Sequence, residues 1–197
     1  MRPRQVRFAG ERRNVERLRE VPIDEILCPP QMNVDRDRVT HPSQRLEGGC
    51  ACGAVRYRLT SDPLVIHCCH CLNCQRQTGS AFVINLLIET DRLELLAGEP
   101  QRVDVPRDSG EQNIWRCPSC QIALYSQYTS PKVRFVRAGT LDDPSSVSPD
   151  AHIFTRSKLP WVTIPDSVPA FEVYYETEKL WPPESLARLE VLRGQSS

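Results

Sequence analysis

Apolar and polar residues alternate along much of the chain from residue 54 onward. Val55, Tyr57 and Leu59 are separated by arginines, which is the pattern of a strand with one buried and one wet face. The run 81–89 (AFVINLLIE) is instead apolar throughout most of its length and partly β-branched. It predicts a buried central strand.

Shorter segments of the same kind extend this pattern toward the carboxyl end. They predict strands at 91–96, 101–105, 113–116, 122–126, 133–138, 152–155 and 170–175. We expect Pro106 to end the strand that precedes it, because proline has no N–H for a sheet. Leu186 and Leu189 follow Pro183 at helical spacing and predict a short C-terminal helix. The fold class expected is therefore mainly β, with antiparallel sheets.

The first part of the chain has a different composition. Residues 1–44 are rich in arginine and contain only scattered apolar residues, so we expect a flexible N-terminal arm. A length of 197 residues suits one domain with its own core. We place that domain at 45–176 and a C-terminal helix or tail at 177–197.

Charge and hydropathy exclude several classes of partner. Lys plus Arg and Asp plus Glu both number 25, so no bulk field favours a nucleic acid or an anionic membrane. No apolar run reaches the roughly 18 residues of a membrane span, and the amino terminus does not resemble a secretory signal. We expect a cytoplasmic protein without a nucleic-acid or membrane partner. The sequence does not predict its oligomeric state.

The nine cysteines are the main candidates for functional residues. Apart from Cys28, they fall into three groups: Cys50 and Cys52, the run 68–74, and Cys117 with Cys120. Cysteines spaced C-x-C, C-x-C-x-x-C and C-x-x-C suit a shared metal ion far better than unstrained disulfides. A reducing compartment agrees with metal binding.

Counting ligands gives two zinc sites per chain. Structural zinc is normally held by four protein ligands, whereas catalytic zinc keeps three and an open position. The two pairs would form the structural site, made of Cys50, Cys52, Cys117 and Cys120. With Cys28 and Cys68 left aside, the remaining thiols, Cys69, Cys71 and Cys74, would hold a second zinc whose fourth position is open to water or to a substrate sulfur.

An alternative closes that fourth position. Cys68 or the ring of His70 lies within reach in sequence and would convert the second site into another structural one.

These motifs, in their order, resemble a known family. The segments GGCACGAVRY at 48–57, CHCLNCQRQTGSAF at 69–82, CPSC at 117–120 and HIFTRSKLPW at 152–161 are similar to the glutathione-dependent formaldehyde-activating enzymes, a family that includes the centromere-protein-V domain. The resemblance covers about 48–175. It implies a β-tent-like fold of antiparallel sheets and the same division of seven cysteines between a structural and a more labile zinc.

Three features depart from the family pattern. Gln121 follows the last cysteine where glycine is common, Cys68 is an extra thiol, and the N-terminal arm has no counterpart. Gln121 affects only a turn, but Cys68 bears on whether the second zinc stays open.

Three functions of different classes fit the sequence. The first is a zinc-dependent carbon–sulfur lyase acting on a thiol–aldehyde adduct such as S-hydroxymethylglutathione, as the resemblance implies. The second is a zinc-stapled structural or interaction module without catalysis. The third is a thiol redox or metal-buffering protein that uses Cys68 and Cys28. The sequence assigns no catalytic residue, although several side chains are candidates for a pocket: His70, Arg76, Phe82, His152, Phe154, Lys158 and Trp161.

Overall fold

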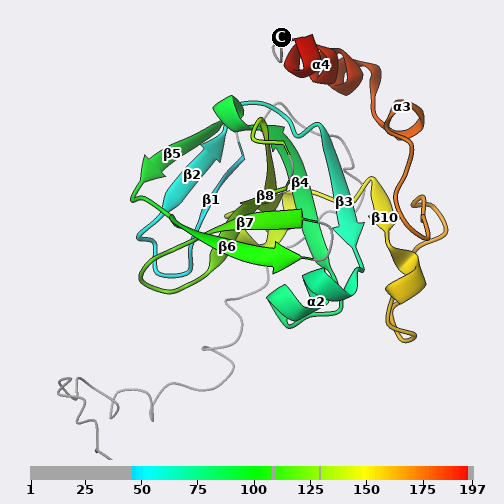
Figure 1. Cartoon of the computed structure of the whole chain (residues 1–197), viewed down its shortest axis with the longest axis horizontal. Coiled ribbons are helices and arrows are strands. Elements are labelled where there is room, and N and C mark those ends of the chain that lie inside the picture. Colours follow the sequence, from blue (N-terminus) through cyan, green and yellow to red (C-terminus); the bar gives the residue numbers. More distant parts are fainter. Residues whose placement is uncertain (1–45, 108–109, 129, 195–197) are drawn as a thin grey trace, which may run out of the picture. The chain divides into compact units, whose positions relative to one another are not determined.

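The structure of the protein is a computed structural model that describes residues 46–107, 110–128 and 130–194 (Figure 1). These residues belong to one compact unit, Arg38–Ser197. The predicted arm at 1–44 and Cys28 lie outside the described residues. Within them, no helix combines the length and the apolar character that crossing a membrane would require.

A small antiparallel sheet begins the described chain. Its strands, in the order in which they pair, are β1 (Glu47–Gly49), β2 (Arg56–Leu59) and β5 (Leu93–Ala97). Val55, Tyr57 and Leu59 are buried, while Arg56 and Arg58 are half-buried. The predicted one-sided strand is therefore confirmed.

A seven-stranded sheet forms the larger part of the fold. In spatial order its strands are β10 (Ala151–Ile153), β3 (Val65–Cys69), β4 (Val83–Glu89), β9 (Val133–Arg137), β8 (Ala123–Gln127), β7 (Gly110–Arg116) and β6 (Gln101–Arg107). All neighbours are antiparallel except β10 and β3, which are parallel. The predicted mainly β, chiefly antiparallel fold is confirmed, and β4 is the buried strand expected from 81–89.

Helices occupy the connections and the carboxyl end. The α-helices are α2 (Leu72–Thr78), α3 (Thr177–Leu180) and α4 (Pro183–Gly194), and the 3-10 turns are η2 (Thr90–Arg92), η3 (Ala138–Thr140), η4 (Pro144–Ser146) and η5 (Thr155–Ser157). The predicted C-terminal helix is thus confirmed. Arg188 on α4 donates to both carboxylate oxygens of Glu89, at 2.8 and 2.5 Å, and so ties the helix to β4.

Two strand predictions were wrong. Pro106 does not end its strand, because β6 continues to Arg107. The strand lies at the edge of the sheet, where a missing N–H leaves no neighbour unsatisfied. The segment 170–175 is not a strand: it forms one bridge, between Ala170 and His152, and otherwise exchanges separate backbone hydrogen bonds with the chain near β10.

The large sheet separates two apolar cores. Ile66, Leu86 and Val136 pack with the small sheet, whereas Val65 and Leu87 pack with the C-terminal segment around Trp181. Successive strand residues point to opposite faces, so β3 supplies side chains to both cores. This alternation decides where each residue of the cysteine-rich run is placed.

Candidate metal centre and pocket

The four cysteines assigned to a structural site meet in space. Cys50 and Cys52 lie on the connection between β1 and β2, while Cys117 and Cys120 lie on the turn between β7 and β8. Cys52 Sγ is 3.4 Å from Cys50 Sγ and 3.6 Å from Cys117 Sγ, and all four sulfurs lie within 4.8 Å of one another. Zn–S bonds of about 2.3 Å at tetrahedral angles place sulfurs about 3.8 Å apart, so these residues fit one zinc ion.

Backbone geometry around this cluster favours thiolates. The N–H of Val55 donates to Cys50 Sγ at 3.2 Å. Burial opposes ionisation of Cys50, but this bond and the neighbouring thiols lower its pKa to about 6. Gln121 adopts a left-handed φ of 63° and its N–H donates to the carbonyl of Cys117, so it takes the turn conformation that glycine adopts more easily.

The second group of thiols lies where β3 passes into α2. Cys69 ends β3, Cys71 caps α2 and accepts a hydrogen bond from the N–H of Cys74 at 3.3 Å, and Cys74 lies in the first turn. Cys74 Sγ is 3.5 Å from Cys69 Sγ, and the three sulfurs lie within 4.8 Å of one another. This cluster has the composition and spacing expected for three zinc ligands.

Without a cation, the three thiols cannot all ionise together. Hydrogen bonds from the thiols of Cys69 and Cys74 lower the pKa of Cys71 to about 2, whereas the hydrogen bonds of Cys69 with Cys71 and Cys74 raise the pKa of Cys69. Thiolates so close together repel one another, and a bound divalent cation removes that penalty. The cluster is therefore one that a divalent cation would stabilise.

Cys68 and His70 lie in a different group. Cys68 is buried among residues that include His70 and His152. His70 Nε2 is 2.9 Å from His152 Nδ1 and 3.6 Å from Cys68 Sγ. Strand alternation turns Cys68 away from Cys69, so the described structure places neither Cys68 nor His70 in the three-thiol cluster.

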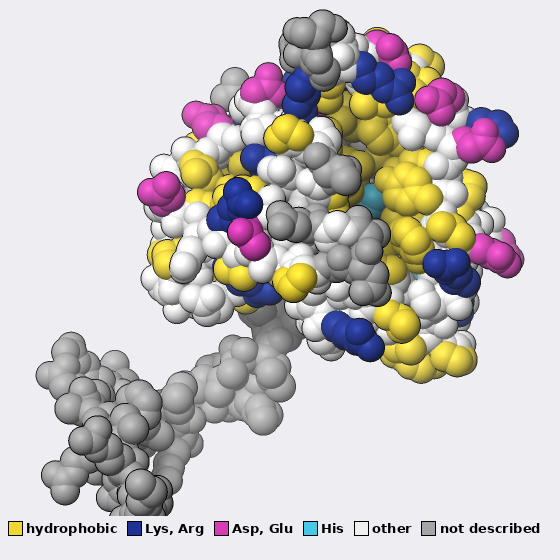
Figure 2. Space-filling model, viewed as in Figure 1, with side chains coloured by type: hydrophobic (Ala, Val, Ile, Leu, Met, Phe, Trp, Pro, Cys, Tyr) yellow, Lys and Arg dark blue, Asp and Glu magenta, His cyan; other side chains and the backbone are white. Residues whose placement is uncertain are grey.

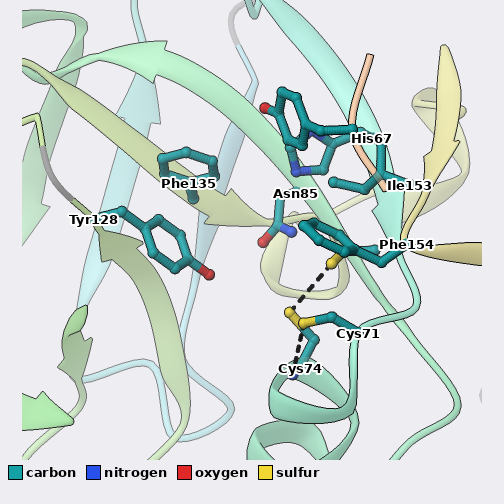
Figure 3. A pocket seen from close by; sticks show the side chains of 10 residues that line it. His67, Cys71, Cys74, Asn85, Tyr128, Phe135, Ile153 and Phe154 are labelled. Atoms are coloured by element: carbon teal, nitrogen blue, oxygen red, sulfur yellow. Dashed lines mark hydrogen bonds between the residues drawn. The ribbon is translucent and has the colours of Figure 1, made fainter. Parts of the chain in front are cut away.

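A cavity of about 180 Å³ opens beside the three thiols (Figure 3). Its lining residues are His67, Cys69, Cys71, Cys74, Asn85, Tyr128, Phe135, Ile153, Phe154 and Tyr174. Figure 2 shows a hollow of this face flanked by hydrophobic side chains, with a histidine visible inside it. Most of the wall is apolar, which suits a small organic ligand held by a few polar groups.

His67 is a neutral polar group in this wall. It is 2% exposed, and burial, reinforced by the charge of Arg137, lowers its pKa to about 3. Its Nδ1 lies 3.3 Å from the hydroxyl of Tyr175, which in turn accepts from the hydroxyl of Tyr174 at 3.3 Å. The imidazole therefore offers hydrogen bonds to the cavity without charge.

Some pocket residues were missed from the sequence and some candidates lie elsewhere. His67 stands two residues before Cys69, so strand alternation could have found it, whereas Asn85 looked like one polar residue in an apolar run. Among the candidates, Phe154 lines the cavity and Phe82 packs edge-on against His70. Trp161 is 72% exposed.

Comparisons with known proteins identify the family of this chain. The family model of the glutathione-dependent formaldehyde-activating enzyme matches residues 45–157. A protein of Halomonas elongata, named as a candidate glutathione-dependent formaldehyde-activating enzyme, is 30% identical over 128 residues, covering 60% of this chain and 80% of that protein. A crystal structure of a Rhodobacter sphaeroides protein is similar with a TM-score of 0.39 and 20% identity, over 52% of this chain and 91% of that one. The chain belongs to the glutathione-dependent formaldehyde-activating enzyme family.

Proposed function

We propose that this protein is a zinc-dependent enzyme that makes or breaks the carbon–sulfur bond between a small thiol and formaldehyde, with S-hydroxymethylglutathione as the adduct. The observation that carries the proposal is the three-thiol cluster in the wall of a cavity. Three thiolates leave one tetrahedral position for an incoming sulfur. Family membership supports glutathione and formaldehyde as the reactants.

The two clusters would have different roles, one structural and one catalytic. Cys50, Cys52, Cys117 and Cys120 would saturate one zinc and hold the small sheet to the β7–β8 turn. Cys69, Cys71 and Cys74 would hold the other zinc as ligands and not as nucleophiles. Both need reduced thiols, which agrees with a cytoplasmic location.

The reaction joins the thiol sulfur to the carbonyl carbon. A zinc ion at the three thiols would supply a thiolate at neutral pH by lowering the pKa of the bound thiol. The cavity then positions the aldehyde carbon near that sulfur. Phe135 and Phe154 exclude water from it, and neutral His67 orients polar atoms of the adduct.

A second candidate function is a zinc-stapled module without catalysis. The placement of Cys68 and His70 outside the three-thiol cluster favours the enzyme, because both residues that could close the site belong to another group. The thiol-redox alternative is weakened by Cys68 itself. Burial raises the pKa of this thiol to about 12, and a reactive thiol needs exposure and a lowered pKa.

The test measures the rate at which ¹³C-formaldehyde exchanges between its hydrate and its glutathione adduct, by NMR, with the zinc-loaded protein. We expect the wild-type protein to accelerate the exchange. Cys71→Ser should lose the acceleration together with one zinc, whereas the matched control Cys68→Ser should keep both. A wild-type protein with two bound zinc ions and no acceleration would reject the enzyme in favour of the structural module.

A further inference from the structure

Three polar residues form a row across the middle of the large sheet. His67 on β3 pairs with Asn85 on β4, and Asn85 pairs with Arg137 on β9. The three residues are 2%, 1% and 6% exposed, respectively. Buried polar side chains are costly unless each has a partner or a task, so the row calls for an explanation.

The Arg137 guanidinium fixes the orientation of Asn85. Arg137 Nη1 donates to Asn85 Oδ1 at 2.6 Å. A guanidinium can only donate hydrogen bonds, so the amide oxygen must face it and the amide nitrogen must face away. Figure 3 shows the Asn85 side chain extending toward the cysteine sulfurs, and Asn85 lines the cavity.

The two N–H groups of Asn85 are available to a ligand. Within the described part of the chain, the bond from Arg137 is the one hydrogen bond of this side chain. Two tyrosine hydroxyls of the wall have partners within the protein: the Tyr174 hydroxyl donates to Tyr175, and the Tyr128 hydroxyl accepts from Gln112 Nε2 at 2.9 Å. Of the His67 ring, Nδ1 lies against the Tyr175 hydroxyl. A preoriented donor pair beside three thiols is the arrangement that stabilises a developing oxyanion.

We propose that Asn85 is a catalytic residue whose amide N–H donates to the oxygen of the aldehyde-derived carbon, and that Arg137 is the positioning residue that aims it. This inference rests on the function proposed above. As the thiolate sulfur attacks formaldehyde, the C–S bond forms and the C=O π pair moves onto oxygen. The amide stabilises that oxyanion without giving up its proton. Water protonates the oxygen, replacing the proton that the thiol released to solvent, and breakdown of the adduct is the reverse.

Asn85→Asp tests the proposed donor with the least change in side-chain shape. A carboxylate has nearly the same shape and can still accept from Arg137, but it replaces the donor with an acceptor. Loss of one oxyanion donor typically lowers kcat by about 10²–10³-fold. We expect a loss of that size in kcat, with an unchanged KM for glutathione and unchanged zinc content. Asn113→Asp, the same exchange at a buried residue of β7 that does not line the cavity, is the matched control and should keep kcat.

A spectroscopic readout is independent of turnover. The side-chain amide resonances of Asn85, assigned by their absence in Asn85→Asp, should shift downfield when formaldehyde is added to the glutathione-saturated protein. If Asn85→Asp fails to fold, the double variant Asn85→Leu/Arg137→Met replaces both partners with apolar groups of similar size, an exchange that can be nearly neutral for stability. It should show the same loss of kcat.

The outcomes separate the two proposals. An active wild-type protein whose folded Asn85 variants keep full kcat, or whose Asn85 amide does not respond to formaldehyde, overturns the role of Asn85 and leaves the proposed function standing. A wild-type protein that does not accelerate adduct exchange overturns both.

Discussion

Replacing one cysteine of each cluster should have different consequences for the fold. Cys117→Ser removes one proposed zinc ligand of the four-thiol cluster, and Cys71→Ser removes one proposed zinc ligand of the three-thiol cluster. We expect the first variant to lose its zinc and unfold. The second should lose its zinc and its activity while keeping its fold.

The difference in magnitude follows from what each cluster connects. The four-thiol site joins the small sheet, whose β1 is three residues long, to a turn of the large sheet. Structural zinc binding contributes about 10–16 kcal/mol in small zinc domains, which is comparable to the roughly 5–15 kcal/mol by which whole domains are stable. Its loss therefore cannot be absorbed by packing alone.

The three-thiol site connects only elements that are already adjacent. Cys69 ends β3, and α2 begins three residues later at Leu72, while β3 keeps its ladders to β4 and β10. We expect Cys71→Ser to lower the free energy of unfolding by about 1–3 kcal/mol, an ordinary value for one substitution. For a unit of this size, that corresponds to a decrease in Tm of roughly 2–10 °C.

Far-UV circular dichroism and thermal unfolding, with zinc counted by mass spectrometry, measure both effects. Cys68→Ser serves as the control and should keep two zinc ions. A Cys117→Ser protein that folds normally with one zinc would refute the claim that the four-thiol site holds the fold. An unfolded Cys71→Ser protein would show that the two clusters share that task.

Two further substitutions test the scaffold. Gly48→Ala should lower the free energy of unfolding by about 1–3 kcal/mol through overpacking, because the added Cβ would lie 2.3 Å from the carbonyl oxygen of Thr140 and 2.6 Å from the hydroxyl of Tyr57. Urea denaturation measures this change. A variant as stable as the wild-type protein would contradict the steric argument. Arg188→Met should lower the free energy of unfolding at pH 7 by about 1.5–3 kcal/mol, because buried Glu89 loses both hydrogen bonds from Arg188 and keeps the weaker contact with Arg92 Nε at 3.4 Å. Burial opposes ionisation of Glu89, but Arg188 holds its pKa below the ordinary value, so the stability from this pair is present above about pH 4.3 and is lost as the pH falls through the lower folded pKa. Thermal unfolding should show that the deficit of Arg188→Met shrinks on acidification, and a deficit that is independent of pH would refute the ion pair.

The sequence predicted the features that depend on local pattern. Alternation around Tyr57 located β2, and the apolar run 81–89 located β4. The strands predicted at 113–116 and 122–126 lie on either side of Cys117 and Cys120, and they correspond to β7 and β8, which pair as a hairpin. These signals are local because pleating and turn geometry act over a few residues.

Features that depend on distant partners were not predictable in this way. Pro106 can remain in a strand because β6 lies at the edge of the sheet. That position depends on how distant strands pair, which a local pattern does not show. Tyr174 reaches the cavity from the segment expected to be a strand, and Phe154 reaches it through a left-handed φ of 55°. A role for Asn85 could be inferred only from the register of β4 against β9, which places Asn85 beside Arg137.

The open position proposed for the second zinc depends on the register of one strand. Cys68 and Cys69 are adjacent in sequence, yet the pleat of β3 sends the first toward His152 and the second into the cavity wall. A slip of one residue against β4 would exchange them and would also move His67 out of the cavity and Ile66 into it. The pairing of His67 with Asn85 and of Cys69 with Val83 therefore keeps the extra thiol away from the three-thiol cluster. The same pairing aligns the polar row of His67, Asn85 and Arg137, so one register places both the proposed metal ligands and the proposed hydrogen-bond donor.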